Sequence, residues 1–504
     1  MFLKGSRIFC IANPVRLNSN YHVLNSTNKS FSCCKALSSG AKIAVIGSGP
    51  AGFYTTQHLL KNGGDTLTVD IFERLPVPFG LVRYGVAPDH PEVKNVENTF
   101  TTTALNPRVK FLGNVSVGKD IKIKELLSAY HAVILAYGAA KDRTLDIPGE
   151  SLGNVISARS FVGFYNGLPE ATDLRKKIRL DTHDSAVIIG LGNVALDVAR
   201  ILLTPVDILR KTDITEEALD MLSRSSIKNV YVVGRRGPLH VSFTIKELRE
   251  MVNLIGARPN FDKEDFYGLR DAIPNLVRPR KRLTELLVKS ALDKATVTQE
   301  ELWSQGSKQW FLKLLRTPLE ILPNKDNTSV SGIKLGINEL CPKGKWNENQ
   351  SISDTGIVET IECGLILRSI GYKSIAVEPG IPYDEKQGII PNESGKITGH
   401  PGLFCAGWLA TGPRGVIVDT MTEAFKVGNT VLENIPELVN QNRYGYDSIK
   451  EIFAERNVKP VTFEDWTKID IKEKEQGKIS GKPREKITDI NKMVSALNIT
   501  QNSK

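Results

Sequence analysis

Three glycines near the start of the chain have the spacing of a dinucleotide-binding turn. Gly47, Gly49 and Gly52 follow an apolar run in the pattern G-x-G-x-x-G, and a helix-length segment comes next. Without a Cβ atom, glycine permits a tight turn, close approach of a pyrophosphate and close packing of the helix on the strand. Glu73 ends the next apolar segment, where a carboxylate accepts hydrogen bonds from an adenosine ribose. Residues 43–73 are therefore predicted to bind one dinucleotide.

A second turn of the same kind lies further along the chain. The apolar run 185–189 is followed by Gly190 and Gly192, and the next segment carries Ala195 in place of the third glycine. Alanine is accepted there because the contact between helix and strand needs only a small side chain. Two such units predict an α/β protein that binds two dinucleotides.

The strand expected at 230–233 ends in Gly234, Arg235 and Arg236 rather than in an acid. Two guanidinium groups where a carboxylate would hold a ribose 2′-hydroxyl favour a 2′-phosphate. The second dinucleotide is therefore predicted to be NADP rather than NAD. The alternative is a solvated pair of arginines at the end of a strand.

Length and composition limit the class of protein. A chain of 504 residues is too long for one core, and no apolar run approaches the roughly 18 residues of a membrane span. No acidic residue precedes Asp65, whereas residues 1–41 contain several basic residues and many serines. This composition is typical of a mitochondrial transit peptide, and a disordered tail is the alternative. We expect a soluble, mildly basic protein of two or more domains.

The cysteines are few and scattered. Three lie in the basic leader and three in the body, without a C-x-x-C pair: Cys10, Cys33, Cys34, Cys341, Cys363 and Cys405. This pattern argues against a redox-active disulfide, a cysteine-ligated iron–sulfur cluster and a structural zinc site. Any redox chemistry is therefore expected on a bound cofactor.

Other candidate groups flank the two turns. Residues 74–96 are rich in proline and glycine, which predicts a loop, and Asp89 and His90 within it either act functionally or fix the loop. A helix is predicted to open near residue 413, where its free N–H groups could stabilise negative charge on a reduced flavin. Trp408, just before it, either belongs to the core or covers a cofactor ring.

Two stretches of the chain are strongly charged. The run 278–282, RPRKR, and Arg249 on the preceding predicted helix form either a solvated face or a docking surface for an acidic partner. Nucleic acid is not the expected partner, because no aromatic residues are interleaved with the basic ones. The tail from Tyr444 is expected to follow the surface, anchored by Phe463 and Trp466.

Several segments together resemble one known family. They are GSGPAGFY (47–54), PFGLVRYGVAPDHPEVKNV (78–96), GLGNVALDVARILLTP (190–205), VVGRRGPL (232–239), FTIKELREM (243–251), RPRKR (278–282), SIGYKS (369–374), GPRGVI (412–417) and SGKPREK (480–486). From about residue 43 to near the C-terminus, the chain resembles mitochondrial NADPH:ferredoxin reductases of the adrenodoxin reductase type. Leu191, where animal members usually have Gln, and residues 409–411, which are less basic than in animals, indicate a fungal or other non-animal member.

The resemblance implies two Rossmann-like domains, with an NADP-binding domain (146–371) inserted into a discontinuous FAD-binding domain (42–145 and 372–504). The implied FAD contacts are Gly47, Ser48, Gly49, Pro50, Ala51, Gly52, Glu73, Leu81, Val117, Trp408, Gly415, Val416 and Ile417. The implied NADP contacts are Leu191 through its backbone, Gly192, Asn193, Val194, Arg235, Arg236, Glu247 and Gly415. Ferredoxin docking falls on Arg249, Arg278 and Arg282, while His90 and Asp197 are the catalytic polar groups expected near the flavin ring. No metal site is expected.

The activity implied by the resemblance is hydride transfer from NADPH to FAD, followed by transfer of single electrons to an acidic two-iron, two-sulfur ferredoxin. That ferredoxin would serve cytochrome P450 hydroxylation, or the assembly of iron–sulfur clusters and haem A. A monomer in the mitochondrial matrix is expected, with peripheral contact to the inner membrane left open. One alternative is a flavin monooxygenase, which needs no ferredoxin; another is a scaffold protein that binds nucleotides without turnover.

Overall fold

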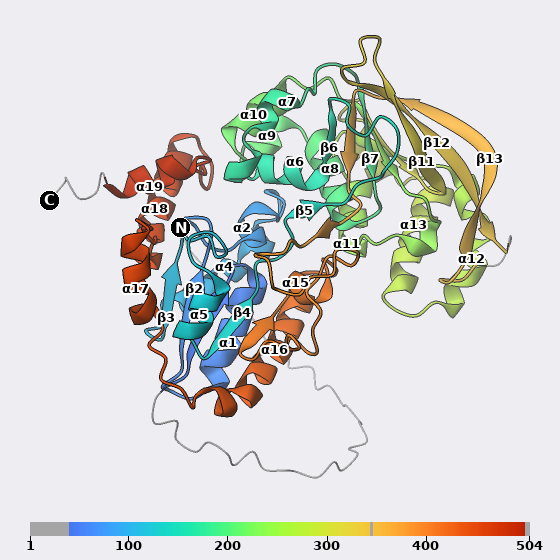
Figure 1. Ribbon diagram of the computed structural model, residues 1–504. Helices are drawn as coiled ribbons and strands as arrows, with labels where there is room; N and C mark the ends of the chain where they lie inside the picture. The colour runs from blue at the N-terminus through green and yellow to red at the C-terminus, as the bar shows by residue number, and fades with distance from the viewer. Residues whose placement is uncertain (1–39, 343–345, 499–504) are drawn as a thin grey trace, which may run out of the picture. The chain divides into compact units, whose positions relative to one another are not determined.

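A five-stranded parallel sheet carries the first predicted turn. In a computed structural model that describes residues 40–342 and 346–498, its strands lie in the order β16-β4-β1-β2-β3 (Figure 1). The strands are β1 (Lys42–Ile46), β2 (Thr68–Phe72), β3 (Val109–Leu112), β4 (Ala132–Leu135) and β16 (Leu403–Cys405). The apolar run of β1 follows from its place between β2 and β4, with both faces covered. Nearly all of the predicted leader, 1–41, lies outside the described residues.

This first half is built from both ends of the chain. Helix α1 (Pro50–Asn62) follows the glycine turn, with Pro50 at its first position, where the missing N–H costs nothing. Helix α16 (Ile417–Leu438) packs against α1, although more than 350 residues separate Asn62 from Ile417. The first half is therefore formed by two separate parts of the chain, which confirms the discontinuous domain of the predicted fold class.

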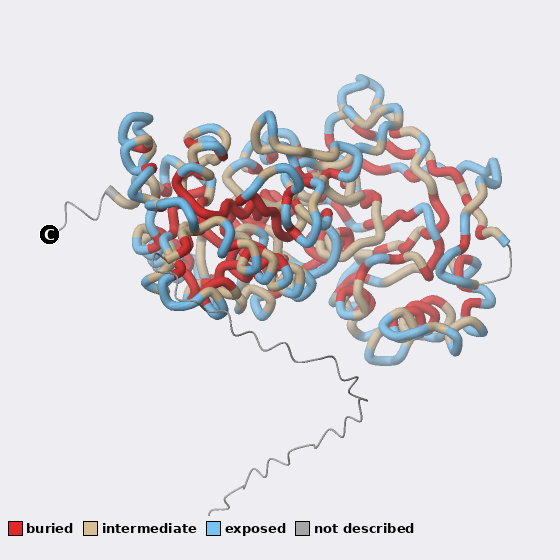
Figure 2. Tube along the Cα trace, turned by 60° about the horizontal axis from the view of Figure 1, so that its bottom comes forward, coloured by how far each residue is buried: buried red, intermediate tan, exposed pale blue. Residues whose placement is uncertain are grey.

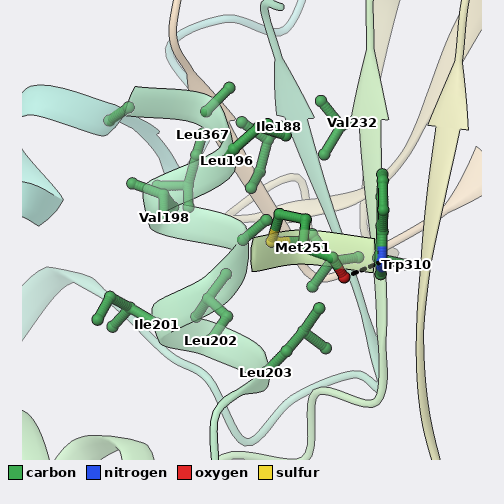
Figure 3. Packing of buried hydrophobic residues seen from close by; sticks show 14 of the residues in the cluster. Ile188, Leu196, Val198, Ile201, Leu202, Leu203, Val232, Met251, Trp310 and Leu367 are labelled. Carbon is green, nitrogen blue, oxygen red and sulfur yellow. Dashed lines mark hydrogen bonds between the residues drawn. The ribbon is translucent and has the colours of Figure 1, made fainter. Parts of the chain in front are cut away.

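A six-stranded parallel sheet forms the second half, in the order β6-β14-β7-β8-β10-β9. Its strands are β6 (Val155–Ser157), β7 (Ser185–Ile189), β8 (Asn229–Val233), β9 (Ala257–Phe261), β10 (Lys308–Lys313) and β14 (Leu365–Arg368). Figure 3 shows α8 (Asn193–Leu203) packed on this sheet, with Leu196 beside Ile188. The buried Trp310 donates its indole N–H to the Met251 carbonyl (3.1 Å), so its only polar atom is satisfied.

Short strands join the two sheets. As the chain leaves β4 for the second sheet it forms β5 (Lys141–Asp142), and as it returns from β14 it forms β15 (Tyr372–Lys373). These two strands pair antiparallel with each other. A separate antiparallel sheet, β11 (Arg316–Pro323), β12 (Val330–Cys341) and β13 (Ser351–Glu362), precedes β14.

The remaining helices surround these sheets. They are α2 (Leu81–Tyr84), α3 (Pro91–Lys94), α4 (Val96–Ala104), α5 (Ile123–Ala129), α6 (Ala158–Tyr165), α7 (Leu174–Lys177), α9 (Val206–Leu209), α10 (Glu216–Ser223), α11 (Ile245–Val252), α12 (Leu269–Ala272), α13 (Arg280–Leu292), α14 (Val297–Trp303), α15 (Trp408–Thr411), α17 (Tyr446–Glu455), α18 (Phe463–Ile479) and α19 (Ile490–Asn498). Figure 2 shows buried residues along the central strands and exposed residues at the outer turns. No helix within the described ranges is long and apolar enough to cross a membrane.

Two segments differ from their predictions. The stretch 74–96, predicted as a loop, contains the helical turns α2 and α3, which are too short to show a period in the sequence. The tail is anchored by the buried Phe463 and Trp466, as predicted, and it differs from the prediction in burying a charged side chain, that of Glu473, among largely exposed residues.

Candidate functional site

The first glycine turn has the shape that a pyrophosphate needs. Gly47 has φ +109°, and a Cβ atom there would lie 2.5 Å from the Ala136 carbonyl oxygen. A Cβ atom at Gly52 would lie 2.0 Å from the Gly47 carbonyl oxygen, whereas nothing lies within 4 Å of that position at Gly49. Two of the glycines are therefore required by the backbone, and the third opens on space that a phosphate can enter.

Glu73 lies at the edge of this turn, as predicted. Its carboxylate accepts hydrogen bonds from the Ser48 N–H (3.1 Å), the Ser48 hydroxyl (2.7 Å) and the Leu75 N–H (3.1 Å). Pro50 and Ala51 follow as the first residues of α1. The acid is thus fixed beside the turn, with capacity to accept further hydrogen bonds from a ribose.

The proline- and glycine-rich segment 74–96 contacts the first glycine turn. Phe79, a non-glycine residue with φ +82°, donates its N–H to the Ser48 carbonyl (3.0 Å). A Cβ atom at Gly80 would lie 3.1 Å from the Gly49 Cα atom. Leu81, the next residue, is exposed. A strained backbone held this close to the turn is a mark of a ligand site.

The other predicted flavin contacts lie on separate elements. Val117 packs against the core of the first half, and Trp408 is half-buried at the start of α15. The Trp408 indole N–H is shielded from solvent and has no partner among the described residues. Gly415, with φ +80°, Val416 and Ile417 lead into α16, where the Val416 N–H donates to Asp419 (2.9 Å). An unpaired buried donor beside a helix N-terminus fits a cofactor with acceptor groups.

The second turn repeats the geometry of the first. Gly190 has φ +137°, and a Cβ atom there would lie 2.1 Å from the Ser369 carbonyl oxygen, whereas Gly192 has nothing within 4 Å. Asn193 and Val194 begin α8, and Ala195 is fully buried at the contact between helix and sheet. The residues present therefore fit a second pyrophosphate.

The second turn is also tied to the segment before α11. The Asn193 side-chain oxygen accepts from the Thr244 N–H (2.8 Å), and the Leu191 carbonyl accepts from the Ser242 and Phe243 N–H groups (2.7 and 2.9 Å). The Leu191 side chain covers Gly234, where a Cβ atom would lie 2.2 Å from it. Leu191 thus fills space with its side chain and uses its carbonyl for structure.

Arg235 and Arg236 are exposed directly after β8. Their carbonyl oxygens accept from the Asn338 side chain (3.1 Å) and the Leu315 N–H (3.3 Å). Neither guanidinium has an ion-pair partner among the residues that the structure describes. The backbone is held while both cationic groups stay available for a phosphate.

A buried arginine brings His90 and Asp197 into one network. The Arg200 guanidinium is 4% exposed and pairs with Asp89 (2.6 Å), Asp197 (2.7 Å), Glu247 (3.2 Å) and Glu250 (3.4 Å), the distances joining nitrogen to oxygen. His90 contacts the same Glu250 (2.7 Å) through Nε2. Sequence reasoning missed Arg200; its signal was one cation inside the apolar helical run ALDVARILL.

One guanidinium shared by several carboxylates leaves them with unequal acidity. Burial raises the pKa of Asp197 to about 6, even though Arg200 lowers it. Burial also raises the pKa of Glu247. For Asp89 the opposing burial is outweighed by the hydrogen bond and charge of Arg200, so its pKa falls below the usual value. Asp197 is therefore a group that can change protonation near neutral pH.

Two of the three predicted docking arginines lie together. Arg249 on α11 and Arg282 on α13 line a cavity of about 460 Å³ with Ile245, Glu285, Leu286 and Lys289. This set of six residues is called the basic groove below. Arg278 is exposed two residues before α13 and does not line the groove.

Comparisons with known proteins agree on one family. A family model described as pyridine nucleotide-disulphide oxidoreductase matches residues 41–252. The mitochondrial NADPH:adrenodoxin oxidoreductase of Salvelinus fontinalis is 51% identical over 459 residues, which cover 90% of this chain and 91% of that protein. The protein of the same name from Bos taurus is 52% identical over 458 residues, 90% of this chain and 92% of its own. The predicted non-animal source is not tested by these identities and stays a prediction.

One solved structure is also similar to most of this chain. Mycobacterium tuberculosis FprA in complex with NADPH superposes with a TM-score of 0.83 at 36% identity, and the match covers 91% of this chain and 100% of that one.

The cysteines in the described part of the chain, Cys341, Cys363 and Cys405, form no disulfide. Burial raises the pKa of Cys363 and of Cys405 to about 12, which keeps both thiols protonated.

The raised pKa of Asp197 predicts a pH-dependent effect of Asp197→Asn. Burial raises the folded pKa of this carboxyl to about 6, above its unfolded value. Its contribution to the free energy of unfolding is therefore complete below the unfolded pKa and is lost as the pH rises through 6. Asparagine is neutral throughout, so unfolding in urea should show the variant gaining about 1 to 3 kcal/mol relative to wild type between pH 4 and 7.

Asp89→Asn is the matched control. The pKa of Asp89 is lowered, so the carboxyl is ionised in both folded and unfolded protein above pH 5. Its effect on unfolding free energy should be constant between pH 5 and 7. A constant difference for Asp197→Asn as well would contradict the assignment.

Proposed function

The chain belongs to the NADPH:adrenodoxin oxidoreductase family, and on that premise we propose that it oxidises NADPH through a bound FAD and reduces a two-iron, two-sulfur ferredoxin. The observation that carries this proposal is the presence in one chain of two complete dinucleotide turns, Gly47–Gly52 and 190–195, each opening on free space. The exposed guanidinium groups of Arg235 and Arg236 beside the second turn would bind the 2′-phosphate of NADPH. The basic groove on α11 and α13 would bind the ferredoxin.

We propose that FAD binds in the first half. The groups that would hold it are Gly47, Ser48, Gly49, Pro50, Ala51, Gly52, Glu73, Leu81, Val117, Trp408, Gly415, Val416 and Ile417. The turn and the α1 N-terminus favour the pyrophosphate, and Glu73 accepts from the ribose. The unpaired Trp408 donor and the N–H groups at the start of α16 complement acceptor atoms and negative charge on the ring.

NADPH would bind in the second half. Its proposed contacts are Leu191, Gly192, Asn193, Val194, Arg235, Arg236, Glu247 and Gly415. The two arginines supply charge-assisted hydrogen bonds to the 2′-phosphate. Glu247 is turned toward Arg200 (3.2 Å), so its part is to orient that cation as well as to contact the nucleotide.

FAD, when bound, supplies the redox chemistry, because it can accept a hydride from NADPH and release the two electrons singly. The chain provides binding and orientation. Arg200 fixes Asp197, and Glu250 fixes His90, so both predicted polar groups have defined positions. Asp197, with its pKa raised to about 6 by burial, can hold or give up a proton at its carboxyl group under physiological conditions.

The ferredoxin would dock on the basic groove and the adjacent Arg278. Arg249, Arg282 and Lys289 outnumber the single acid Glu285, so the groove attracts a negatively charged surface. The mitochondrial names of the relatives support a mitochondrial protein, and we place it in the matrix as a monomer, with peripheral contact to the inner membrane open.

We further propose the domain division 42–145 and 372–504 for FAD and 146–371 for NADP. The short strands β5 and β15, which connect the two sheets, lie next to both boundaries and support it.

The function is tested by cytochrome c reduction with the purified protein and NADPH. A large increase on adding a two-iron ferredoxin is expected, because electrons must leave one at a time. If NADPH bleaches the flavin but ferredoxin adds nothing, the monooxygenase alternative replaces the proposal. If NADPH leaves the flavin oxidised, binding without turnover replaces it.

Arg235→Ala combined with Arg236→Ala should raise the KM for NADPH far more than the KM for NADH. Each lost charge-assisted contact costs about 1.5 to 3 kcal/mol, or roughly tenfold or more. Steady-state ferricyanide reduction measures both constants. Lys325→Ala, on the exposed turn between β11 and β12, is the control. Equal changes for both nucleotides would remove the 2′-phosphate assignment.

Arg282→Glu should raise the KM for ferredoxin about tenfold while NADPH–ferricyanide activity stays unchanged, because one charge of the groove is reversed. The difference from wild type should shrink at high salt. Lys124→Glu on α5 makes the same charge change elsewhere on the exposed surface and should have no effect. A parallel loss of both activities would mean that Arg282 is structural.

A further inference from the structure

The C-terminal segment buries charged side chains that none of the proposed binding sites uses. Lys482 and Lys486 of the SGKPREK motif are 4% and 3% exposed, and Glu473 on α18 is fully buried. A buried charge is costly unless it is paired and hydrogen-bonded. The partners of these residues therefore identify what the segment holds.

Lys486 reaches the second half of the protein. Its Nζ atom lies 2.8 Å from the Asp213 carboxylate and donates to the Asp213 carbonyl (3.2 Å), between α9 and α10. The same carboxylate accepts two hydrogen bonds from Lys94 of α3 (2.7 and 2.8 Å), which belongs to the segment 74–96. Burial opposes the charge of Asp213, but Lys486 and Lys94 outweigh it and hold its pKa well below the usual value. One acid thus joins three separate parts of the chain.

Lys482 adds a second contact to the same region. Its Nζ atom pairs with Glu216 (3.1 Å) at the start of α10 and with Glu485 (2.5 Å). The Glu216 N–H in turn donates to the Glu485 carboxylate (3.1 Å). The motif is therefore held to the start of α10 by both side chains and backbone.

The other end of the C-terminal segment, at Glu473, contacts the segment 74–96, which covers the first glycine turn. Glu473 accepts from the buried Arg83 (2.6 Å), whose guanidinium lies 4.9 Å from the centre of the Trp466 ring. Arg83 belongs to α2, which follows the Phe79–Gly80 turn that meets Gly49. The loop that carries Leu81, Asp89 and His90 is thereby fixed from the tail.

We propose that residues 473–486 form a clasp that fixes the NADP-binding half against the segment 74–96. In this clasp Lys486 and Asp213 are positioning residues for hydride transfer. The proposal rests on the function proposed above. Neither residue is among the proposed cofactor contacts, so both act through the placement of other groups. Placement matters because an error of about 1 Å between reacting groups can cost roughly 10²-fold in rate.

The test uses the holoenzyme with Lys486→Met, Asp213→Asn and the two combined. Anaerobic stopped-flow mixing with NADPH should show the flavin bleaching at least about tenfold more slowly, with unchanged FAD content and unchanged Kd for NADP⁺. The double variant should be no slower than Asp213→Asn alone, because Asp213→Asn already loses the contact that Lys486→Met removes. Lys486→Arg, which keeps the cation, should recover part of the rate.

Hydrogen exchange gives a readout independent of activity. In the protein without NADPH, residues 91–94 and 210–216 should exchange faster in the Lys486 and Asp213 variants, while α1 should not change. Arg456→Ala is the matched control, because it removes an exposed ion pair between the tail and Glu125 on α5, away from the second half. Its bleaching rate and exchange should equal those of wild type.

Two results would overturn the clasp. Bleaching and exchange at wild-type values in Lys486→Met and Asp213→Asn would mean that the contact positions nothing. Slower bleaching accompanied by loss of FAD or weaker NADP⁺ binding would mean general instability. If Lys486→Met does not fold, the isosteric Asp213→Asn decides alone. Failure of NADPH to bleach the wild-type flavin would instead refute the proposed function, and the clasp would lose its role with it.

Discussion

A single buried cation, Arg200, constrains the arrangement of the candidate site. A guanidinium that is almost completely removed from water must be surrounded by acceptors. Arg200 finds Asp89 in the segment 74–96, Asp197 one turn earlier on its own helix, and Glu247 on α11. Because these three acids belong to different elements, the loop of the first half and two helices of the second must converge on one point.

Helix α11 links this interior network to the surface. Glu247 and Arg249 are two residues apart, which places them about 200° apart around a helix, and so on opposite sides. Glu247 accordingly faces Arg200, whereas Arg249 is exposed and lines the basic groove. Thr244, the residue just before this helix, donates its N–H to the Asn193 side chain at the second turn. One short helix thus connects the proposed nucleotide site, the internal ion pairs and the proposed docking surface.

The tail shows the same use of buried charge. Glu473 pairs with Arg83 of the first half, whereas Lys482 and Lys486 pair with Glu216 and Asp213 of the second half. Their long side chains pack as apolar stems while their charged ends are paired. A largely exposed segment thus buries three charged side chains, and its composition alone does not show which of its charges are buried.

The sequence by itself determined the features that depend on neighbouring residues. The two glycine turns, the acid at Glu73 and the arginines after β8 were predictable because strand, turn and helix follow one another within each unit, and backbone sterics require glycine at Gly47 and Gly190. The α/β class followed from finding two such units, whereas the insertion of one domain into the other was implied by the family resemblance. Tertiary structure alone decided that Asp197 and Glu247 share Arg200 and that His90 contacts Glu250 of the same network. It also decided that the segment 74–96 meets Gly49 and that Lys486 reaches Asp213. These contacts join residues far apart in the chain, and their energies depend on burial, which no local pattern encodes.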